Sequence, residues 1–290
     1  MASLKEYNRK LARLKSTKKL TKTMYMVSAN KLRKAQTALK RTELYHDKLV
    51  SILRGLMYAG ADVGKIPACL PRKQKKRFLV LVVESDRGLC GGFNNNLNKA
   101  VLKWTTNLAP EIGTTIYTCG KKATVYLKNR ASVENTYDGF TVKPRFVDAQ
   151  RIASDLHSAF LKSRADEVYI AYNQYKSVIS QQPVIEKFLP ISDELLSGPK
   201  DGKAHKDILL DSDCDEILNE AIPQMMSLTV FRSMMISSVG EHAARMTAME
   251  NSKNNSEKLI DAITLLRNRA RQAAITNELS EIISGAEALN

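Results

Sequence analysis

The last third of the chain carries its longest uninterrupted pattern of apolar and polar positions. Between Gln224 and Leu289 there is no proline, and Gly240 and Gly285 are the only glycines. Apolar or small side chains recur there at alternating steps of four and three residues, which is the period of a coiled-coil seam. The pattern predicts one helix of roughly 90 Å whose seam needs a partner helix. The seam positions are Met235, Val239, His242, Met246 and Met249, and then Ile275, Leu279, Ile282, Ala286 and Leu289.

The start of the chain predicts the partner for this helix. Residues 4–59 contain no proline and a single glycine, Gly55, but Lys18 and Thr21 fall where apolar residues would continue the seam. A helix that is basic nearly all round and apolar only in patches is not stable alone, so we expect it to pack antiparallel against the C-terminal helix. Its heptad positions are Leu4, Tyr7, Leu11 and Leu14, and then Tyr45, Leu49, Ile52 and Leu56.

Between the two long helices the pattern is that of an α/β domain. Residues 78–84, FLVLVVE, form a short β-branched apolar run that is typical of a buried strand. Alternating strands and helices predict a small parallel-type three-layer sheet. The predicted fold is therefore a Rossmann-like α/β domain plus a long antiparallel coiled coil made by the N- and C-terminal helices. Further strands are predicted at 115–118, 167–173 and, as an edge strand, 183–189, and helices at 97–108, 121–129 and 148–163.

Proline, glycine and polar stretches divide the chain into five predicted parts. A polar loop and a short helix at Asp213–Ala221 precede the last helix, and Pro223 is expected in the first turn of that helix, where proline is tolerated. The parts are the N-terminal coiled-coil helix at 1–60, a linker at 61–77, the α/β domain at 78–190, the loop and short helix at 191–222, and the C-terminal coiled-coil helix at 223–290.

Charge adds an expectation about partners. Residues 1–77 carry 21 Lys+Arg against 4 Asp+Glu, whereas the remaining 213 carry 24 against 26. Positive charge confined to one end indicates an acidic partner surface, whether protein, nucleic acid or anionic lipid; the alternative is a solvated helix face. No apolar run approaches the length of a membrane span, and the first residues lack a signal-peptide core, so we expect neither a transmembrane helix nor export.

The motifs do not predict catalysis. Residues 85–93, SDRGLCGGF, follow the first strand but match neither GxGxxG nor GxxxxGK[ST]. We expect a tight strand-to-helix turn there, with a phosphate-binding loop as the alternative. The four cysteines and four histidines are scattered and form no metal-ligand or catalytic pattern. We therefore expect no catalytic residue, no cofactor and no metal.

Three blocks of the sequence carry a more specific pattern. They are LKSTKKLTKTMYMVSANKLRKAQ at 14–36, SDRGLCGGFN at 85–94, and the segment 241–289, which contains ITNELSEIISGAEA. In content and spacing these blocks resemble the gamma subunits of F-type ATP synthases. Two residues depart from that family: Glu84 stands where it commonly has threonine, and Arg267 stands where it commonly has tyrosine.

The resemblance implies a non-catalytic rotor shaft with several protein partners. The coiled coil would enter a ring of alternating alpha and beta subunits, and the base would join the epsilon subunit and the membrane ring of c subunits. Rotation driven by proton or sodium flow would change the nucleotide affinities of the catalytic beta subunits. The chain would then be peripheral, held to the cytoplasmic face of a bacterial inner membrane through the complex, with a processed organellar chain as the alternative.

The resemblance also implies which residues contact the stator. Lysine, arginine and glutamine side chains there would make directional hydrogen bonds in some angular positions and not in others. For each residue the alternative is a solvated position on the coil surface. The implied contact residues are Lys22 and Met24 in the first block and Arg245, Arg271, Gln272, Thr276 and Glu278 in the last.

Two functions of other classes remain as alternatives. A basic coiled-coil protein that binds nucleic acid would explain the charge of the first helix, but aromatic residues are not interleaved with the basic ones as a stacking surface requires. A nucleotide-binding enzyme would use the α/β sheet, and it predicts nucleotide binding by the isolated chain. We expect neither nucleic-acid nor nucleotide binding.

Overall fold

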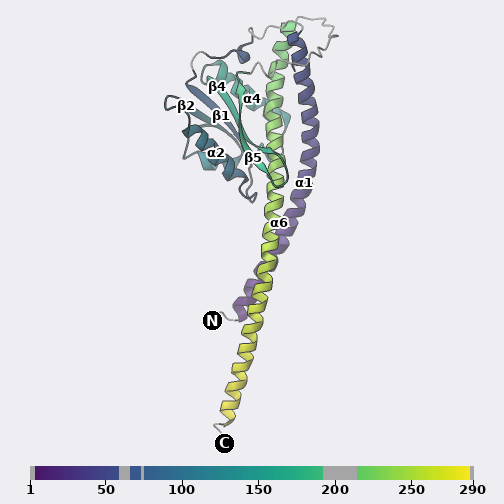
Figure 1. Cartoon of the computed structure of the whole chain (residues 1–290), viewed down its shortest axis with the longest axis vertical. Coiled ribbons are helices and arrows are strands. Elements are labelled where there is room, and N and C mark those ends of the chain that lie inside the picture. The colour runs from purple at the N-terminus through teal and green to yellow at the C-terminus, as the bar shows by residue number, and fades with distance from the viewer. Residues whose placement is uncertain (1–3, 59–65, 73–74, 192–213, 288–290) are drawn as a thin grey trace. The chain divides into compact units, whose positions relative to one another are not determined.

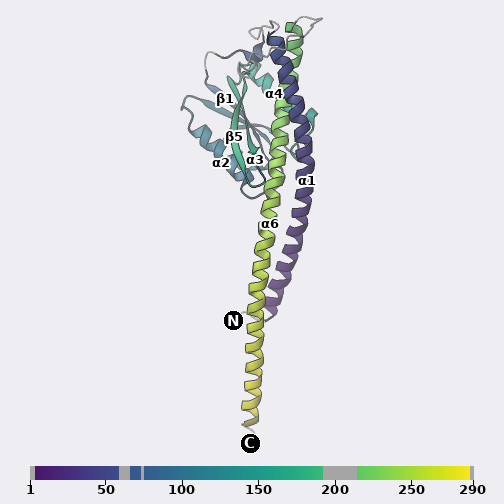
Figure 2. The same cartoon turned by 45° about the vertical axis from the view of Figure 1, so that its right-hand side comes forward.

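The chain forms two compact units in a computed structural model that describes residues 4–58, 66–72, 75–191 and 214–287. One unit comprises Met1–Ala29 with Arg245–Asn290, and the other comprises Asn30–Ala244. Helices α1 (Leu4–Tyr58) and α6 (Cys214–Glu287) contribute to both. Within each unit these helices lie side by side and run in opposite directions (Figures 1 and 2). The expected pairing of the two chain ends is therefore present.

Most buried residues of α1 follow a seven-residue repeat. The prediction that Tyr45 and Ile52 belong to the seam is wrong, because they are 58% and 52% exposed. The heptad positions that begin with Leu4 and Leu11 continue instead, at steps of seven residues, to half-buried His46 and buried Leu53. Leu49 and Leu56 fit both sets of heptad positions, which is why the sequence pattern was ambiguous. The fully buried members of the repeat are Leu11, Thr21, Ser28, Leu32, Leu39, Thr42, Leu53 and Leu56.

Helix α6 begins earlier than predicted. It starts at Cys214 and runs through Pro223, so a separate short helix followed by a new helix at 223 is wrong. An interior proline removes a backbone donor and costs about 3 kcal/mol. Buried residues on both sides of it, Leu218 and Ile222 before and Met225 after, favour one continuous helix. Most of the expected loop at 191–212 and part of the expected linker at 61–77 lie outside the described residues.

The predicted α6 seam is buried along its first half only. Met235, Val239 and Met249 are buried, and His242 and Met246 are half-buried. The second half, at Ile275, Leu279 and Ile282, is 48–67% exposed, so the expectation that the first helix covers it is wrong. The side chains of Ala286 and Leu289 lie outside the described residues.

The α/β part of the larger unit is a mixed five-stranded sheet. The strand order is β3-β2-β1-β4-β5. Four strands are parallel, and β5 pairs antiparallel with β4. The strands are β1 (Arg77–Val83), β2 (Gly113–Cys119), β3 (Val133–Tyr137), β4 (Glu167–Tyr175) and β5 (Gln181–Leu189), and the connecting helices are α2 (Phe93–Thr106), α3 (Lys121–Leu127) and α4 (Phe146–Leu161), with a short 3₁₀ turn, η2 (Pro67–Cys69).

Helices cover both faces of this sheet, as the predicted three-layer fold requires. Val80 and Val82 of β1 pack in one cluster with Leu97 of α2 and Leu127 of α3. On the other face lie α4 and α6, joined by an edge-to-face contact of Phe146 and Phe231 at 5.9 Å between ring centroids. The predicted α/β fold class is confirmed. Strand β3 was not predicted, because this short edge strand, VENTY, is half exposed and reads as polar.

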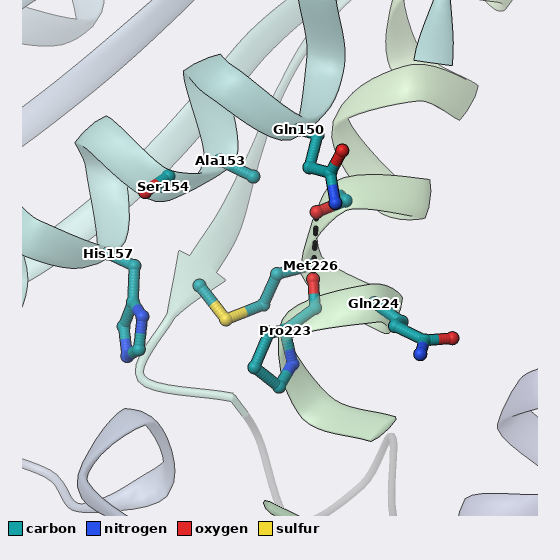
Figure 3. Close-up of a pocket in the computed structure, with 8 residues that line it drawn as sticks. Gln150, Ala153, Ser154, His157, Pro223, Gln224 and Met226 are labelled. Carbon is teal, nitrogen blue, oxygen red and sulfur yellow. Dashed lines mark hydrogen bonds between the residues drawn. The ribbon is translucent and has the colours of Figure 1, made fainter. Parts of the chain in front are cut away.

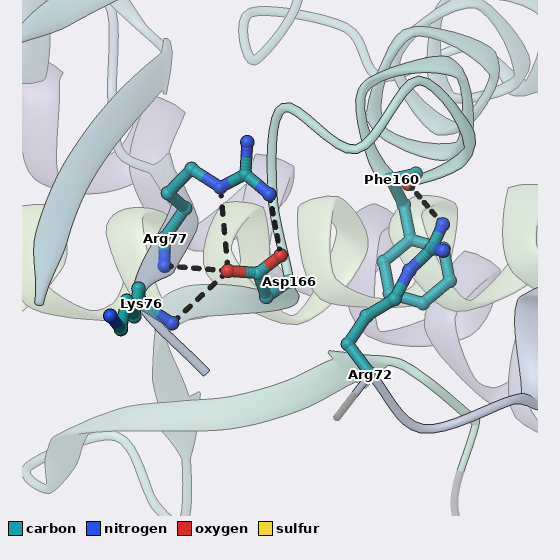
Figure 4. Close-up of polar contacts among 5 residues, drawn as sticks. All are labelled: Arg72, Lys76, Arg77, Phe160 and Asp166. Atoms are coloured by element: carbon teal, nitrogen blue, oxygen red, sulfur yellow. Dashed lines mark hydrogen bonds and ion pairs between the residues drawn. The ribbon is translucent and has the colours of Figure 1, made fainter. Parts of the chain in front are cut away.

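A buried carboxylate fixes the corner where β1 and β4 begin (Figure 4). Asp166 Oδ2 accepts hydrogen bonds from the backbone nitrogens of Lys76 and Arg77, at 3.0 and 2.9 Å, and Oδ1 lies 2.9 Å from Arg77 Nη2. Nearby, Arg72 donates to the Phe160 carbonyl oxygen at 2.9 Å and lies over the Phe160 ring. These contacts attach the segment before β1 to the end of α4.

Candidate functional site

All of the expected contact residues lie in the smaller unit, where the two chain ends meet. Within it, Lys18 of α1 and Glu257 of α6 are level with one another, because their side chains form an ion pair at 3.0 Å. The ion pair therefore gives the level of every expected contact residue along the two antiparallel helices.

The seam between these helices contains hydroxyl groups as well as apolar side chains. Leu11, Met249 and Ile263 are buried, but so are Thr21 and Ser256. Thr21 donates to backbone carbonyls one turn back, at 3.0 and 3.1 Å, and Ser256 donates to the Ser252 carbonyl at 2.8 Å. Each hydroxyl is satisfied by its own helix, so a polar seam position here carries no unpaired group.

The expected contact residues form two groups rather than one cluster. Lys22 is exposed and Met24 half-buried, one turn and more from Lys18 on α1. Arg271 lies 14 residues beyond Glu257 in the opposite direction. At 1.5 Å per residue, the level of Lys22 and the level of Arg271 are on the order of 27 Å apart. The structure therefore places Lys22 and Met24 at nearly the same level of α1, on different sides of the helix, and separates both from the C-terminal group.

Arg245 differs from the other expected contact residues. It is buried, with 8% of its surface exposed, and its side chain has interactions within the chain. In this structure it is thus part of the packing rather than a residue presented to solvent.

The C-terminal group lies on a helix segment that is exposed on every side. From Arg271 to Gly285 the described side chains are exposed, apart from half-buried Ala274. Leu4 precedes Lys18 by 14 residues, so the described part of α1 begins level with Arg271. Thr276 donates its hydroxyl to the Gln272 carbonyl at 3.0 Å. Exposed apolar residues share this segment, namely Ile275, Leu279, Ile282 and Ile283.

Charge is distributed unequally between the two helices of this unit. Residues 1–29 contain eight Lys+Arg and one acidic residue, Glu6, whereas residues 245–290 contain six of each sign. Lys18 and Lys22 both act on Glu257, whose pKa is lowered chiefly by the hydrogen bond from Lys18. An external partner of α1 would therefore meet a positive surface, and one of the α6 end would meet a mixed apolar and polar surface.

Asp86, in the loop after β1, accepts four hydrogen bonds from other parts of the α/β fold. Asp86 Oδ1 accepts hydrogen bonds from the backbone nitrogens of Lys121 and Gly139, at 2.9 and 2.8 Å. Its Oδ2 accepts from the Thr141 hydroxyl at 2.6 Å and backbone nitrogen at 3.2 Å. Burial alone would raise the pKa of Asp86, but these hydrogen bonds outweigh it and hold the pKa below its ordinary value. Its donors lie at the start of α3 and in the segment after β3, so Asp86 ties these parts of the chain to the loop, which favours a structural turn.

A cavity of about 230 Å³ lies between α4 and α6 (Figure 3). Among the described residues that line it, His157 is the only titratable one, and burial lowers its pKa. Ser227 donates to the Pro223 carbonyl at 2.8 Å, next to the cavity. Within the described ranges, no three His, Cys, Asp or Glu side chains are grouped to hold a metal ion. The lining offers no paired acid and base for catalysis.

Comparisons with known proteins concern the whole chain. A family model described as ATP synthase matches residues 3–289. The chain is 37% identical over 291 residues to the ATP synthase gamma chain of Trichlorobacter lovleyi, covering 100% of this chain and 99% of that protein. It is 36% identical over 296 residues to that of Rubrobacter xylanophilus, with the same coverage.

Solved structures of low sequence identity share the fold. A chain of the Euglena gracilis mitochondrial ATP synthase, from a structure of OSCP, F1 and the c-ring, aligns with a TM-score of 0.66 at 20% identity, covering 99% of this chain and 94% of that one. A chain of the rotor of the same enzyme aligns with a TM-score of 0.61 at 19% identity, covering 94% and 98%. Among the described helices, none combines the length and apolar character needed to cross a bilayer.

Proposed function

We propose that this chain, which belongs to the ATP synthase gamma chain family, is the central rotor shaft of an ion-translocating ATP synthase. In that role it couples rotation of a membrane c-ring to ATP synthesis or hydrolysis in the beta subunits. The chain supplies no catalytic group, and the chemistry belongs to the beta subunits.

One observation carries the proposal: the end of α6 is exposed on all sides and is apolar at several positions. Isolated exposed helices in water are marginal, and exposed Ile and Leu at helical spacing usually mark a binding surface. A collar of alpha and beta subunits around the segment from Arg271 to Gly285 would cover every side of it at once. A partner on a single face would leave the others in water.

The paired helices suit the transmission of torque. Within the smaller unit the seam repeats without a proline, and the ion pair of Lys18 and Glu257 bridges the two helices. A stiff shaft changes the conformation of a beta subunit only if it binds one conformation more tightly than another. A partner that binds two conformations equally does not shift the equilibrium between them. The different surfaces of α1, positive, and α6, mixed, supply that asymmetry.

The two groups of expected contact residues then receive different roles. Lys22 and Met24 would meet acidic segments of the beta subunits, which accounts for the positive charge of α1. Arg271, Gln272, Thr276 and Glu278 would meet the inside of the collar. Arg245 would act from within the shaft, holding its own helix in place.

The partners at the other end would be the epsilon subunit and the c-ring. Through them the chain would be held, as a peripheral subunit, on the cytoplasmic face of a bacterial inner membrane. Neither of the other two functions is proposed. The relatives compared above are named ATP synthase gamma chains, and the loop after β1 matches neither of the nucleotide-binding motifs considered for it.

Reconstitution with purified alpha and beta subunits tests the proposal. We expect one copy of the chain in each alpha–beta ring, measured by native mass spectrometry. Recovery of the chain free of the ring, together with its retention on DNA at physiological salt, would contradict the proposal.

A further inference from the structure

Glu84 is a buried acid that directly follows β1. None of its surface is exposed. Its backbone nitrogen donates to the Cys119 carbonyl oxygen at 2.8 Å, which fixes it at the carboxyl end of the parallel strands. The side chain is therefore held inside the α/β part by its own backbone.

Three side-chain oxygens at this place are unpaired among the residues that the structure describes. Both carboxyl oxygens of Glu84 and the Oδ1 atom of Asn98 on α2 are buried without a hydrogen-bond partner. The side chains of Glu84 and Asn98 are neighbours and interact. A carboxylate is an acceptor only, so an ionised Glu84 would add two unpaired oxygens to the one on Asn98. An unpaired buried charge is far more costly than a neutral hydrogen-bonded group.

We propose that Glu84 is a proton-binding site: in the folded protein its carboxyl group carries a proton and donates it as a hydrogen bond to Asn98 Oδ1. One bound proton pairs one Glu84 oxygen with Asn98 Oδ1, leaves a single neutral acceptor unpaired in place of three, and removes the buried charge. No other ligand is needed.

Burial is the largest influence on the ionisation of Glu84, and it favours the protonated form. Burial raises the pKa of Glu84 to about 8, while the Asn98 side chain and the positive charge of Lys122 lower it less than burial raises it. Other titratable groups on the surrounding elements are the Cys119 thiol of β2, Asp86 of the following loop and Glu241 of α6, one turn from Ser237, which donates to the Val83 carbonyl at 3.2 Å. None of these is a cation that would favour an ionised Glu84.

Release of the proton would act on the junction of the sheet with α6. Ser237 of α6 bonds the Val83 carbonyl, one residue before Glu84. Gly240 lies against the Phe93 ring at the start of α2, so closely that an added Cβ would be 3.0 Å from it. Glu84 follows Val83 and neighbours Asn98 of α2. If its carboxyl group ionised, the buried charge would draw in water or displace α2. The bound proton therefore stabilises the packing of β1, α2 and α6 against one another.

The sign of the pH effect follows from linkage. The folded state holds the proton up to about pH 8, whereas an unfolded glutamate loses it near its ordinary value of 4.5. Between these values the folded state binds more protons, so the stabilisation is complete below about pH 4.5 and is lost as pH rises toward 8. The folding equilibrium constant contributed by this group falls by up to about tenfold for each pH unit in that window.

Urea unfolding of the full chain between pH 5 and pH 8 tests the proposal. The single tryptophan, Trp104, lies on α2 with Asn98 and reports on this region by fluorescence. Glu84→Gln keeps a donor for Asn98 and cannot ionise, so we expect a flatter pH dependence than in the unaltered chain. Glu111→Gln, at an exposed position, is the matched control and should follow the unaltered chain. A decline in Glu84→Gln as steep as in the unaltered chain would overturn the proposal.

A second measurement does not depend on how the variant folds. In the unaltered chain labelled with ¹³C at glutamate carboxyl groups, one resonance should titrate near pH 8 while the chain remains folded. If every glutamate resonance titrates below about pH 6, Glu84 is ionised in the folded protein and the proposal is wrong.

Discussion

Lys18 and Glu257 join the two ends of the chain, with Lys18 Nζ 3.0 Å from Glu257 Oε1. The two residues are 239 positions apart in sequence, and each side chain is 40% exposed. Lys18 occupies a seam position where the heptad pattern predicts an apolar residue, and Glu257 gives it a partner at that position. The pair sets the level of one helix against the other, and hence the point near Arg271 beyond which α6 continues uncovered.

Reversing the charge at this pair should loosen the smaller unit. In Lys18→Glu two carboxylates face each other, and adding Glu257→Lys should restore most of the loss. The effect should be small, because exposed ion pairs are screened, and it should shrink in 1 M salt, where the Debye length is about 3 Å. Thermal unfolding followed by circular dichroism measures it. Lys19→Glu, at the next, exposed position, is the control, and an equal loss there would mean that net charge rather than the pair is responsible.

The same pair gives a pH dependence of known sign. Because the pKa of Glu257 is lowered in the folded chain, first by the Lys18 hydrogen bond, its stabilisation is present above the ordinary pKa of glutamate and is lost as pH falls below it. Lys18→Met should therefore reduce the acid sensitivity of helix content between about pH 5 and pH 3. An unchanged acid profile would show that the pair adds nothing in solution.

Asp86→Asn should destabilise the α/β part by about 2 kcal/mol, since hydrogen bonds to a charged group are each worth 1.5 kcal/mol or more and several are weakened together. The Asp86 carboxylate binds the start of α3 and the segment after β3. Because its folded pKa is lowered, this stabilisation is also lost on acidification. Urea unfolding monitored by Trp104 measures it. Asp138→Asn removes an exposed carboxylate with one such bond, from Thr124, and should cost less; an equal or larger cost would contradict the role given to Asp86.

The sequence predicted the elements whose patterns are one-sided or apolar throughout. Residues 78–83 are buried on both faces of the sheet and were recognised as a strand. Strand β3 was missed because an edge strand with alternating exposure offers few apolar residues. Pro223 misled the prediction of the helix start, since local proline preference was overridden by burial on both sides of it.

The candidate site was predictable only in part. Heptad spacing identified the seam, but the same spacing at Ile275 and Leu279 cannot tell a partner within the chain from one outside it. That distinction depends on how far α1 reaches, which the register of Lys18 and Glu257 decides. The role of Asp86 was not predicted at all, because its hydrogen-bond donors come from loops more than thirty residues away. Its position between a strand and a glycine-containing loop was the only available signal.

Ending the chain after Arg271 should separate function from folding. Apart from half-buried Ala274, the described side chains that are removed, at 272–285, are exposed, so the stability of the larger unit should change by less than about 0.5 kcal/mol. Assembly with alpha and beta subunits, or ATP-driven ion pumping by the assembled complex, should be weakened. Unfolding of the α/β part in the truncated chain, read from Trp104 fluorescence, would show that the two parts are not independent.

Lys22→Glu should impair coupling several-fold more than Lys128→Glu. Both positions are exposed, and both substitutions change the net charge equally, but Lys128 lies at the end of α3, in the other unit and outside the expected contact residues. The ratio of ions pumped to ATP hydrolysed in reconstituted vesicles measures coupling. Equal impairment by the two substitutions would argue against a contact at Lys22.

Single-molecule rotation tests the central claim most directly. Val125 on α3 is 65% exposed, and Cys69, Cys90 and Cys119 are buried, so Val125→Cys in a Cys214→Ser background gives one accessible attachment point among the described residues. With the alpha–beta ring fixed to a surface, a bead on this cysteine should turn in one direction in discrete steps when ATP is added. ATP hydrolysis by the assembled complex with the bead stationary would contradict the account.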